Sequence, residues 1–371
     1  MRSVFYFPKE YVLSSLWPMY ILSFFVLPLL IVVSVKKFFF RENKENREVF
    51  SLETSLDLRG IAACVVMIHH FALRTKTPDK MFYYWFVGYI AVGVFFFLSG
   101  YASFFQLERK EEKFWDNYFP KRFFRLLLPF VITNSVYAIF YCHSISEYFE
   151  AMFTLRQIKG NPSEWSVVWF LAVILLFTVL FWISFRFVGA NKKIGVGIFF
   201  VGTVIFILVN RYLLHSISYW FNSSLAYVTG IAYCMYKDKI SDFVNRFKKV
   251  LIPILTILVL GIFFATTKGY QFWWIQVTCC ELCLCLFVTL EYSVQIRSEI
   301  FKKIGTASWE IFLIHPLVYV VYFSVFKDHF GLSGVICIAI GLTLGLLINA
   351  LDEKIFSCVF GGRKKLIMSK N

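Results

Sequence analysis

Charged residues are scarce in this sequence, and acidic residues are scarcer than basic ones. Asp, Glu, Lys and Arg make up 16% of the 371 residues, whereas an ordinary soluble domain carries about a quarter. Hydrophobic residues account for 59% of the chain, which is more apolar surface than a soluble protein of this length can bury. This composition excludes a soluble enzyme, a disordered tail and a disulfide-stapled secreted domain. It predicts that lipid surrounds most of the chain.

Signals for metal binding and nucleic-acid binding are missing as well. The nine Cys lie almost entirely within apolar runs, and four of them cluster mid-run at Cys279, Cys280, Cys283 and Cys285. One helix cannot place four such close ligands around a tetrahedral ion, so we expect buried thiols and no metal. The net charge of +15 belongs to the loops of a membrane protein, because no basic run lies on a soluble domain large enough to bind nucleic acid.

Long apolar runs are what the sequence has in abundance. About 20 apolar residues cross a bilayer as a helix. The chain contains eleven such runs, at 17–35, 57–74, 83–105, 123–142, 166–187, 194–213, 216–236, 250–266, 271–293, 304–326 and 331–350. The sequence therefore predicts an all-α polytopic integral membrane protein with about 11 transmembrane helices, in which one N-terminal helix precedes a ten-helix core.

Basic residues divide the loops into two groups. Most of the 38 Lys and Arg fall in six segments that would share one side, at 36–47, 109–125, 186–193, 237–249, 297–303 and 354–371. The positive-inside rule places these segments in the cytoplasm, where they also meet anionic lipid, so the N-terminus is predicted outside and the C-terminus inside. We expect an N-terminal helix with a basic cytoplasmic loop (1–50), a membrane domain (51–353) and a short basic cytoplasmic tail (354–371). The longest outside loop, 143–165, is either a partial lid or a plain connection.

Ionisable residues inside an apolar span are expensive in lipid and mark candidate functional sites. In the second span, Arg59 stands at the cytoplasmic entrance and His70 follows eleven residues later. A helix rises about 16 Å over that interval and turns about 20° past three full turns, so both side chains share one face, with His70 near mid-bilayer. His69 is rotated by about 80° from Arg59. The pair is either a chemical site, with a phosphate-competent cation and a titratable imidazole, or a set of buried groups that hydrogen-bond to neighbouring helices.

Two further groups of polar residues accompany this pair. His315 in the tenth span lies at a depth similar to that of His70, and Pro316 frees a backbone carbonyl one turn earlier. Structural packing and catalysis are equally good interpretations of His315. Arg122 and Arg125 begin the fourth span and are three residues apart on one helix face. Their guanidinium groups would suit a phosphate or pyrophosphate, or would anchor the helix at the cytoplasmic surface.

Five motifs occur in a fixed order along the chain: Leu56-Asp57-Leu58-Arg59-Gly60 followed by His70; Gly93-Val94-Phe95-Phe96-Phe97-Leu98-Ser99-Gly100-Tyr101; Arg122-x-x-Arg125 with Pro129; Trp169-Phe170-Leu171; and Ile311-Phe312-Leu313-Ile314-His315-Pro316. Each motif alone is weak. Together, in this order and topology, they resemble the membrane-bound acyltransferase 3 family, whose best-known members O-acetylate bacterial surface polysaccharides. The resemblance runs from about residue 52 to 350, which is most of the chain.

The resemblance implies an O-acetyltransferase of the bacterial cell membrane. Such an enzyme would move an acyl group from a cytoplasmic acyl-CoA, acetyl-CoA above all, to a hydroxyl of an extracytoplasmic or lipid-linked glycan. It implies His70 as the catalytic histidine, acting as a general base or through an acyl-histidine, with His315 orienting His70 or binding the acceptor. It also implies that Arg59, Arg122 and Arg125 hold the donor or the active geometry.

Two departures from the family's pattern leave part of this expectation open. Many relatives lack the added first helix that this chain has. Others carry a soluble C-terminal domain that this chain lacks, so a separate extracytoplasmic partner for the transfer is an open alternative. A transporter or flippase for a glycan or another polar substrate is the alternative function, because buried His and Arg side chains also line transport pathways. It predicts substrate movement without consumption of acetyl-CoA.

Overall fold

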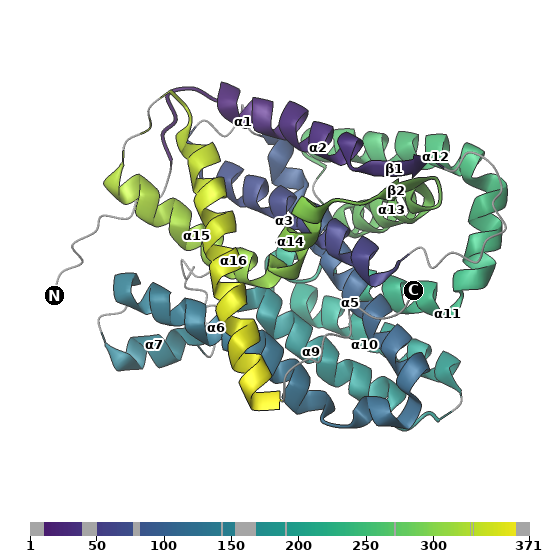
Figure 1. Cartoon of the computed structure of the whole chain (residues 1–371). Helices are drawn as coiled ribbons and strands as arrows, with labels where there is room; N and C mark the ends of the chain where they lie inside the picture. Colours follow the sequence, from purple (N-terminus) through teal and green to yellow (C-terminus); the bar gives the residue numbers. More distant parts are fainter. Residues whose placement is uncertain are drawn as a thin grey trace.

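The computed structural model describes residues 11–38, 50–76, 82–141, 144–152, 168–189, 191–270, 272–326, 328 and 330–360. These residues are almost entirely helical, as Figure 1 shows. The α-helices in chain order are α1 (Trp17–Ile21), α2 (Leu27–Val33), α3 (Leu52–Ala72), α5 (Gly88–Lys110), α6 (Tyr118–Tyr141), α7 (Ile145–Met152), α9 (Val168–Phe185), α10 (Lys192–Leu208), α11 (Leu225–Met235), α12 (Lys237–Thr267), α13 (Trp273–Glu291), α14 (Glu299–Thr306), α15 (Ser308–Val325) and α16 (Ser333–Phe360). Two π-helical turns (Leu22–Val26 and Val209–Leu213), three 3₁₀ turns (Phe82–Phe86, Glu111–Trp115 and Ser218–Trp220) and two strands, β1 (Val35–Phe38) and β2 (Val294–Ile296), complete the elements.

Nine helical segments of the described chain are long and apolar enough to cross a membrane. Each coincides with a span expected from the sequence, and the protein is an all-α polytopic membrane protein. The other two expected spans are shorter helices. The first is the continuous helix Trp17–Val33, formed by α1, a π-turn and α2. The second, expected at 216–236, contains only the eleven residues of α11, because a 3₁₀ turn at Ser218–Trp220 and a further turn use up its first half.

The helix α3 begins earlier than its apolar run suggests, because a polar residue caps it. The Ser51 hydroxyl accepts a hydrogen bond from the backbone N–H of Thr54 at 3.2 Å, so the helix starts at Leu52 and not at 57. Arg59 consequently lies two turns inside the helix and not at its entrance. His70 lies in the last turn of the helix.

Close backbone contacts hold α3 and α5 to their neighbours. A Cβ atom added to Gly60 of α3 would collide with the backbone of Phe301 in α14. A Cβ atom added to Gly100 of α5 would likewise collide with the backbone of Tyr227 in α11. The small residue Gly100, at the end of the third expected span, therefore permits close helix approach.

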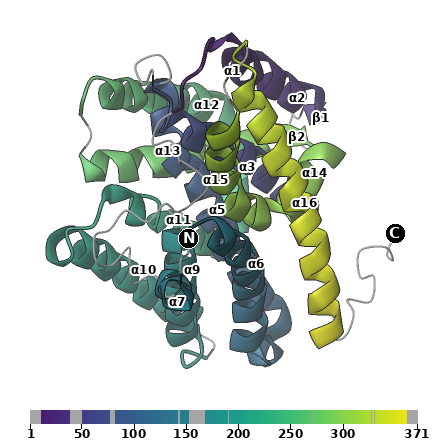
Figure 2. The ribbon, with the colours of Figure 1, turned by 90° about the vertical axis from the view of Figure 1, so that its left-hand side faces the viewer.

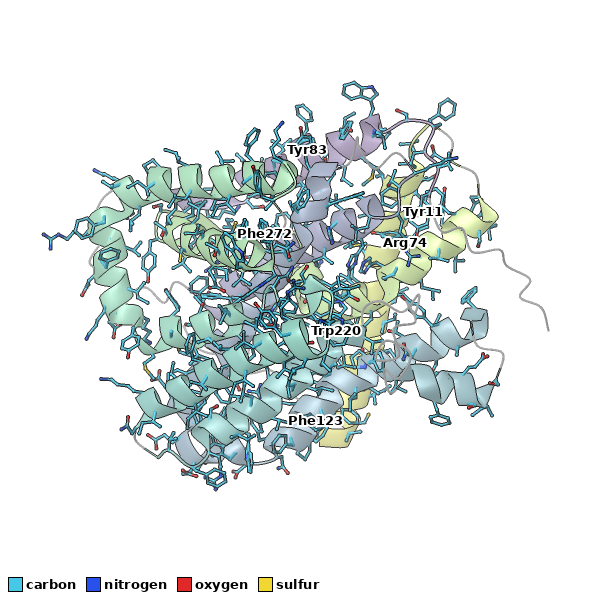
Figure 3. The ribbon with its side chains drawn as sticks, turned by 180° about the vertical axis from the view of Figure 1, so that it is seen from behind. Tyr11, Arg74, Tyr83, Phe123, Trp220 and Phe272 are labelled. Atoms are coloured by element: carbon cyan, nitrogen blue, oxygen red, sulfur yellow. The ribbon has the colours of Figure 1, made fainter. Side chains whose placement is uncertain are left out.

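The N-terminal segment is joined to the core by a short strap, residues 11–16. The backbone N–H of Tyr11 donates to the carbonyl of Arg74 at 2.6 Å, and Figure 3 shows these two residues side by side. The carboxylate of Asp328 accepts hydrogen bonds at 2.6 Å from both the backbone N–H and the hydroxyl of Ser14. The strap thus fastens the first helix to the segments that follow α3 and α15.

The other end of the first helix is joined to the core by a two-stranded ribbon. The strand β1 pairs antiparallel with β2, with Val35 opposite Ile296 and Phe38 opposite Val294. The expected basic loop at 36–47 therefore begins as a strand, and its remainder lies outside the described residues. The same holds for residues 361–371 of the expected tail. Of the outside loop at 143–165, the described part is mainly the short helix α7.

The last helix, α16, extends along the height of the bundle and packs on α15 and α6 (Figure 2). The helix α3 contacts α5, α14 and α15. The residues with candidate chemistry on α3 and α15 therefore face each other inside the bundle.

Candidate active site

Two histidines from different helices meet inside the bundle. The Nδ1 atom of His70 on α3 lies 2.7 Å from the Nε2 atom of His315 on α15, which is hydrogen-bonding distance. The two rings are nearly parallel, with centroids 4.9 Å apart and planes 6° apart. His315 has no exposed surface, whereas His70 is half-buried. The structure thus joins the two imidazoles that the sequence placed at similar depths.

A backbone carbonyl sets the proton positions in this pair. The Nδ1 atom of His315 lies 2.9 Å from the carbonyl oxygen of Ile311, which can only accept a hydrogen bond. In a neutral His315, Nδ1 therefore carries the proton and Nε2 has the lone pair. His70 must then donate its own Nδ1–H to that lone pair, which leaves Nε2 of His70 as a free base. The contacts from the Ile311 carbonyl through His315 therefore select the neutral tautomer of His70 that has its lone pair on Nε2.

The neighbouring His69 belongs to a different environment. Its Nδ1 atom lies 2.8 Å from the carbonyl oxygen of Tyr84, and its ring fills the space left by the missing side chain of Gly88. Helical spacing predicts that His69 points about 80° away from Arg59. In the structure His70, and not His69, pairs with His315. His69 is a packed histidine next to the pair.

Aromatic residues close one side of the histidine pair. The ring of Tyr319 stands edge-on to His315 with centroids 5.5 Å apart, and its hydroxyl donates to the carbonyl of Met67 at 3.0 Å. Tyr11 of the strap packs on this group, stacked on Phe323 at 4.5 Å. Tyr11 is 1% exposed, so the added N-terminal segment contributes a fully buried wall to the site.

A cavity of about 110 Å³ lies on the other side, beside Arg59. Nine residues from five helices line it: Arg59, Phe95, Ser99, Leu126, Phe170, Ile174, Ser308, Trp309 and Phe312. The Nε atom of Arg59 is buried and has no hydrogen-bond partner within the described part of the chain. A buried N–H donor without a hydrogen-bond partner is costly. The cavity therefore suits a ligand that brings acceptor oxygens to Arg59.

The other two predicted arginines lie elsewhere. Arg122 donates to the hydroxyl of Ser103 on α5 at 3.2 Å and lies over the ring of Tyr118 at 4.6 Å. Arg125 is exposed and lies over the ring of Phe356 on α16 at 4.4 Å. The two guanidinium groups thus turn toward different helices, and neither lines the cavity beside Arg59.

The expectation of buried thiols in α13 is correct for Cys279 and Cys280 and wrong for the other two, because Cys283 is partly exposed and Cys285 is exposed. Cys279 and Cys280 have no exposed surface, and the thiol of Cys280 lies 3.9 Å from the carbonyl oxygen of Tyr89. In the described ranges, no group of three or more His, Cys, Asp or Glu side chains could hold a metal ion.

A family model described as an acyltransferase domain matches residues 53–350. The chain belongs to the acyltransferase 3 family. The match contains both helices of the histidine pair and every residue that lines the cavity. This membrane acyltransferase has no significant match among curated proteins or among solved structures.

Sequence reasoning missed the aromatic part of this acyltransferase's site. Trp309 and Phe312 stood in or beside a recognised motif but were assigned no role. Trp309 lies six residues and Phe312 three residues before His315, which places all three on successive turns of α15. That spacing was the available signal. Tyr11 gave no signal, because it lies outside every recognised motif and far from either histidine in the chain.

Proposed function

We propose that this acyltransferase is an O-acetyltransferase. It moves an acetyl group from acetyl-CoA to a hydroxyl of an extracytoplasmic or lipid-linked glycan, with His70 as the central catalytic residue. The observation that carries this proposal is the chain of contacts from the Ile311 carbonyl through His315 to His70, which leaves a basic nitrogen on His70. Family membership supplies the acyl-transfer chemistry for which such a base is useful.

The proposed reaction uses His70 to move one proton. Nε2 of His70 takes the proton from the acceptor hydroxyl as its oxygen attacks the thioester carbonyl. The carbon–sulfur bond then breaks, and the proton on Nε2 passes to the leaving thiolate. A second route begins with attack of Nε2 on the thioester carbonyl, which breaks the carbon–sulfur bond, releases the thiolate and gives an acetyl-histidine. The acceptor hydroxyl then attacks the acetyl carbonyl, the carbon–nitrogen bond breaks, and the hydroxyl proton passes to the thiolate. Both routes require the same tautomer of His70, and in both His315 positions it.

The proposed donor site begins at Arg59. Its buried Nε and the cavity beside it offer a place for the oxygens of the donor's pantetheine arm or phosphates. Arg122 and Arg125 are proposed contacts for the outer phosphates, toward the basic side of the membrane. A cytoplasmic donor, an N-terminus outside, a bacterial cell membrane and a separate extracytoplasmic transfer partner remain parts of this proposal.

Replacement of His70 by Gln tests the proposal. The purified protein would be assayed with acetyl-CoA and candidate glycans, and both release of CoA and acetylation of the glycan would be measured. Because His70 is the base, we expect His70→Gln to lower both rates by about 100- to 10,000-fold. His69→Gln is the matched control, and it should retain most of the activity. Equal activity in wild type and His70→Gln would refute the role of His70. Glycan movement without release of CoA would favour a transporter.

A further inference from the structure

Phe312 stands between the cavity and the histidine pair. It lies three residues before His315 on α15 and is one of the nine residues that line the cavity. Its ring centroid lies 6.0 Å from the ring of His70 and 6.0 Å from the ring of His315. None of the other lining residues has a ring contact with either histidine among the described residues. Within the part of the chain that the structure describes, Phe312 is therefore the one lining residue of the cavity whose ring also contacts both histidines.

Neighbouring aromatic side chains hold Phe312 in place. The Phe312 ring stacks on Trp309 with centroids 5.8 Å apart and planes 17° apart, and it packs against Phe170 at 5.3 Å. The indole N–H of Trp309 donates to the carbonyl of Leu126 at 3.1 Å, which fixes the indole to α6. Phe312 is only 6% exposed. The wall thus consists of one anchored indole and two rings that pack on each other.

The backbone at this point of α15 carries one restraint fewer than an ordinary helix. Pro316 has no N–H, so the carbonyl of Phe312 lacks the hydrogen bond it would otherwise receive one turn later. The side chain that separates the cavity from the histidines therefore sits on a turn that lacks one backbone hydrogen bond of a regular helix.

The size of the cavity limits what can reach this wall. Its volume is about 110 Å³, and a cavity of about 150 Å³ is known to take up a molecule as large as benzene. An acyl group of two to four carbons fits such a space, whereas a fatty acyl chain does not fit without movement of its walls. The lining near Phe312 is apolar, which suits the methyl end of a short acyl group.

We propose that Phe312 is a gate and a length filter between the donor cavity and the histidine pair, and that the protein accepts short acyl-CoA thioesters and excludes long ones. This inference rests on the proposed function. A thioester in the cavity reaches His70 when the Phe312 ring swings aside. When the ring is in place, it keeps water and long chains from His70. The ring thus determines both acyl length and loss of the acyl group to water.

The test compares three variants of the full-length protein with wild type. Phe312→Ala removes the ring, and Phe312→Leu removes its aromatic breadth while keeping a branched side chain. Phe104→Ala is the matched control, because Phe104 is an equally buried ring on α5 that packs on Phe185, away from the cavity. Release of CoA would be measured with acetyl-CoA, butyryl-CoA and octanoyl-CoA, with and without a glycan acceptor.

The expected result is a change in selectivity confined to the Phe312 variants. Phe312→Ala should raise the ratio of octanoyl-CoA to acetyl-CoA turnover by about 10- to 100-fold, the range over which a hydrophobic pocket discriminates chain length. It should also raise hydrolysis without acceptor. Phe312→Leu should raise the turnover ratio and the hydrolysis rate to a smaller extent. This variant tests the proposal if Phe312→Ala does not fold. Phe104→Ala should leave the ratio at its wild-type value.

Two outcomes would overturn the proposal in distinguishable ways. If wild type releases CoA but the ratio is the same in the Phe312 variants and in Phe104→Ala, Phe312 is not a filter and the proposed function stands. If wild type releases no CoA from any of the three thioesters, the proposed function fails, and the gate fails with it.

Discussion

Removing the side chain of His315 tests whether the contact chain through it determines the chemistry of His70. His315→Ala deletes the acceptor that lies 2.7 Å from Nδ1 of His70 and leaves the rest of α15 able to form its helix. His70 then has no partner that holds its proton on Nδ1. A larger share of the molecules will carry the proton on Nε2, where it blocks proton transfer from the acceptor.

The size of this effect follows from the hydrogen bond that is lost. One intramolecular hydrogen bond contributes about 1 kcal/mol net, and a buried donor left without a partner costs about 1–3 kcal/mol. Since about 1.4 kcal/mol corresponds to a factor of ten in rate, kcat should fall by about 10- to 100-fold. This loss is smaller than the loss expected for His70 itself, because the base is still present in a fraction of the molecules. KM for acetyl-CoA should change little, because His315 does not line the donor cavity.

The assay is steady-state release of CoA at saturating glycan, with kcat and KM determined separately. His315→Gln is the informative companion, because its amide oxygen can accept from the Nδ1–H of His70 and should restore part of kcat. Thermal unfolding in detergent checks that both variants are folded. A kcat of wild-type size in His315→Ala would refute the reasoning, and so would equal defects in His315→Ala and His315→Gln with normal unfolding temperatures.

Three further predictions concern stability, measured as unfolding temperature in detergent. Gly100→Ala should destabilise the protein by about 1–3 kcal/mol, because its new methyl group would press on the backbone of Tyr227. Gly197→Ala on α10, where nothing lies within 4 Å, should instead gain up to about 1 kcal/mol from helix propensity, and a loss there of equal size would contradict this explanation. Burial raises the pKa of Asp328, but hydrogen bonds from Ser14 and neighbouring groups outweigh it and lower the pKa below its usual 3.8. Asp328 should therefore add stability above about pH 4 that disappears as the pH falls through its folded-state pKa. Asp328→Asn should be less stable than wild type at pH 6 and approach it near pH 3, and a constant difference would argue against this account.

Local features of the fold were readable from the sequence. Apolar runs of about 20 residues predict helices because lipid leaves no other partner for the backbone, and nine such runs are long helices in the described residues. The extent of α11 was misjudged, because five of the nine residues at 216–224 are Ser or Asn and this part of the expected span forms turns. The early start of α3 depends on the hydroxyl of Ser51, a single polar atom outside the apolar run.

Part of the candidate site was also predictable from the sequence, and part of it depends on the packing of distant segments. Helical spacing placed Arg59 and His70 on one face, and equal depth linked His70 with His315. The sequence could not predict that Nδ1 of His70 faces Nε2 of His315, because this contact depends on the packing of α3 against α15. The orientations of Arg122 and Arg125 also depend on neighbours far away in the chain, namely Ser103 and Phe356. No spacing rule links residues across such distances.

The attachments of α3 have a consequence for how the enzyme can move during turnover. Two turns into the helix, α3 is pressed backbone to backbone against α14 at Gly60, and after its end the strap is bonded to the following turn at Arg74. A helix held at these two points cannot slide or rotate to deliver His70 to different partners. His70 is therefore the stationary part of the machinery. Donor and acceptor must come to it, and the adjustments that admit them fall to the opposite wall, on α15.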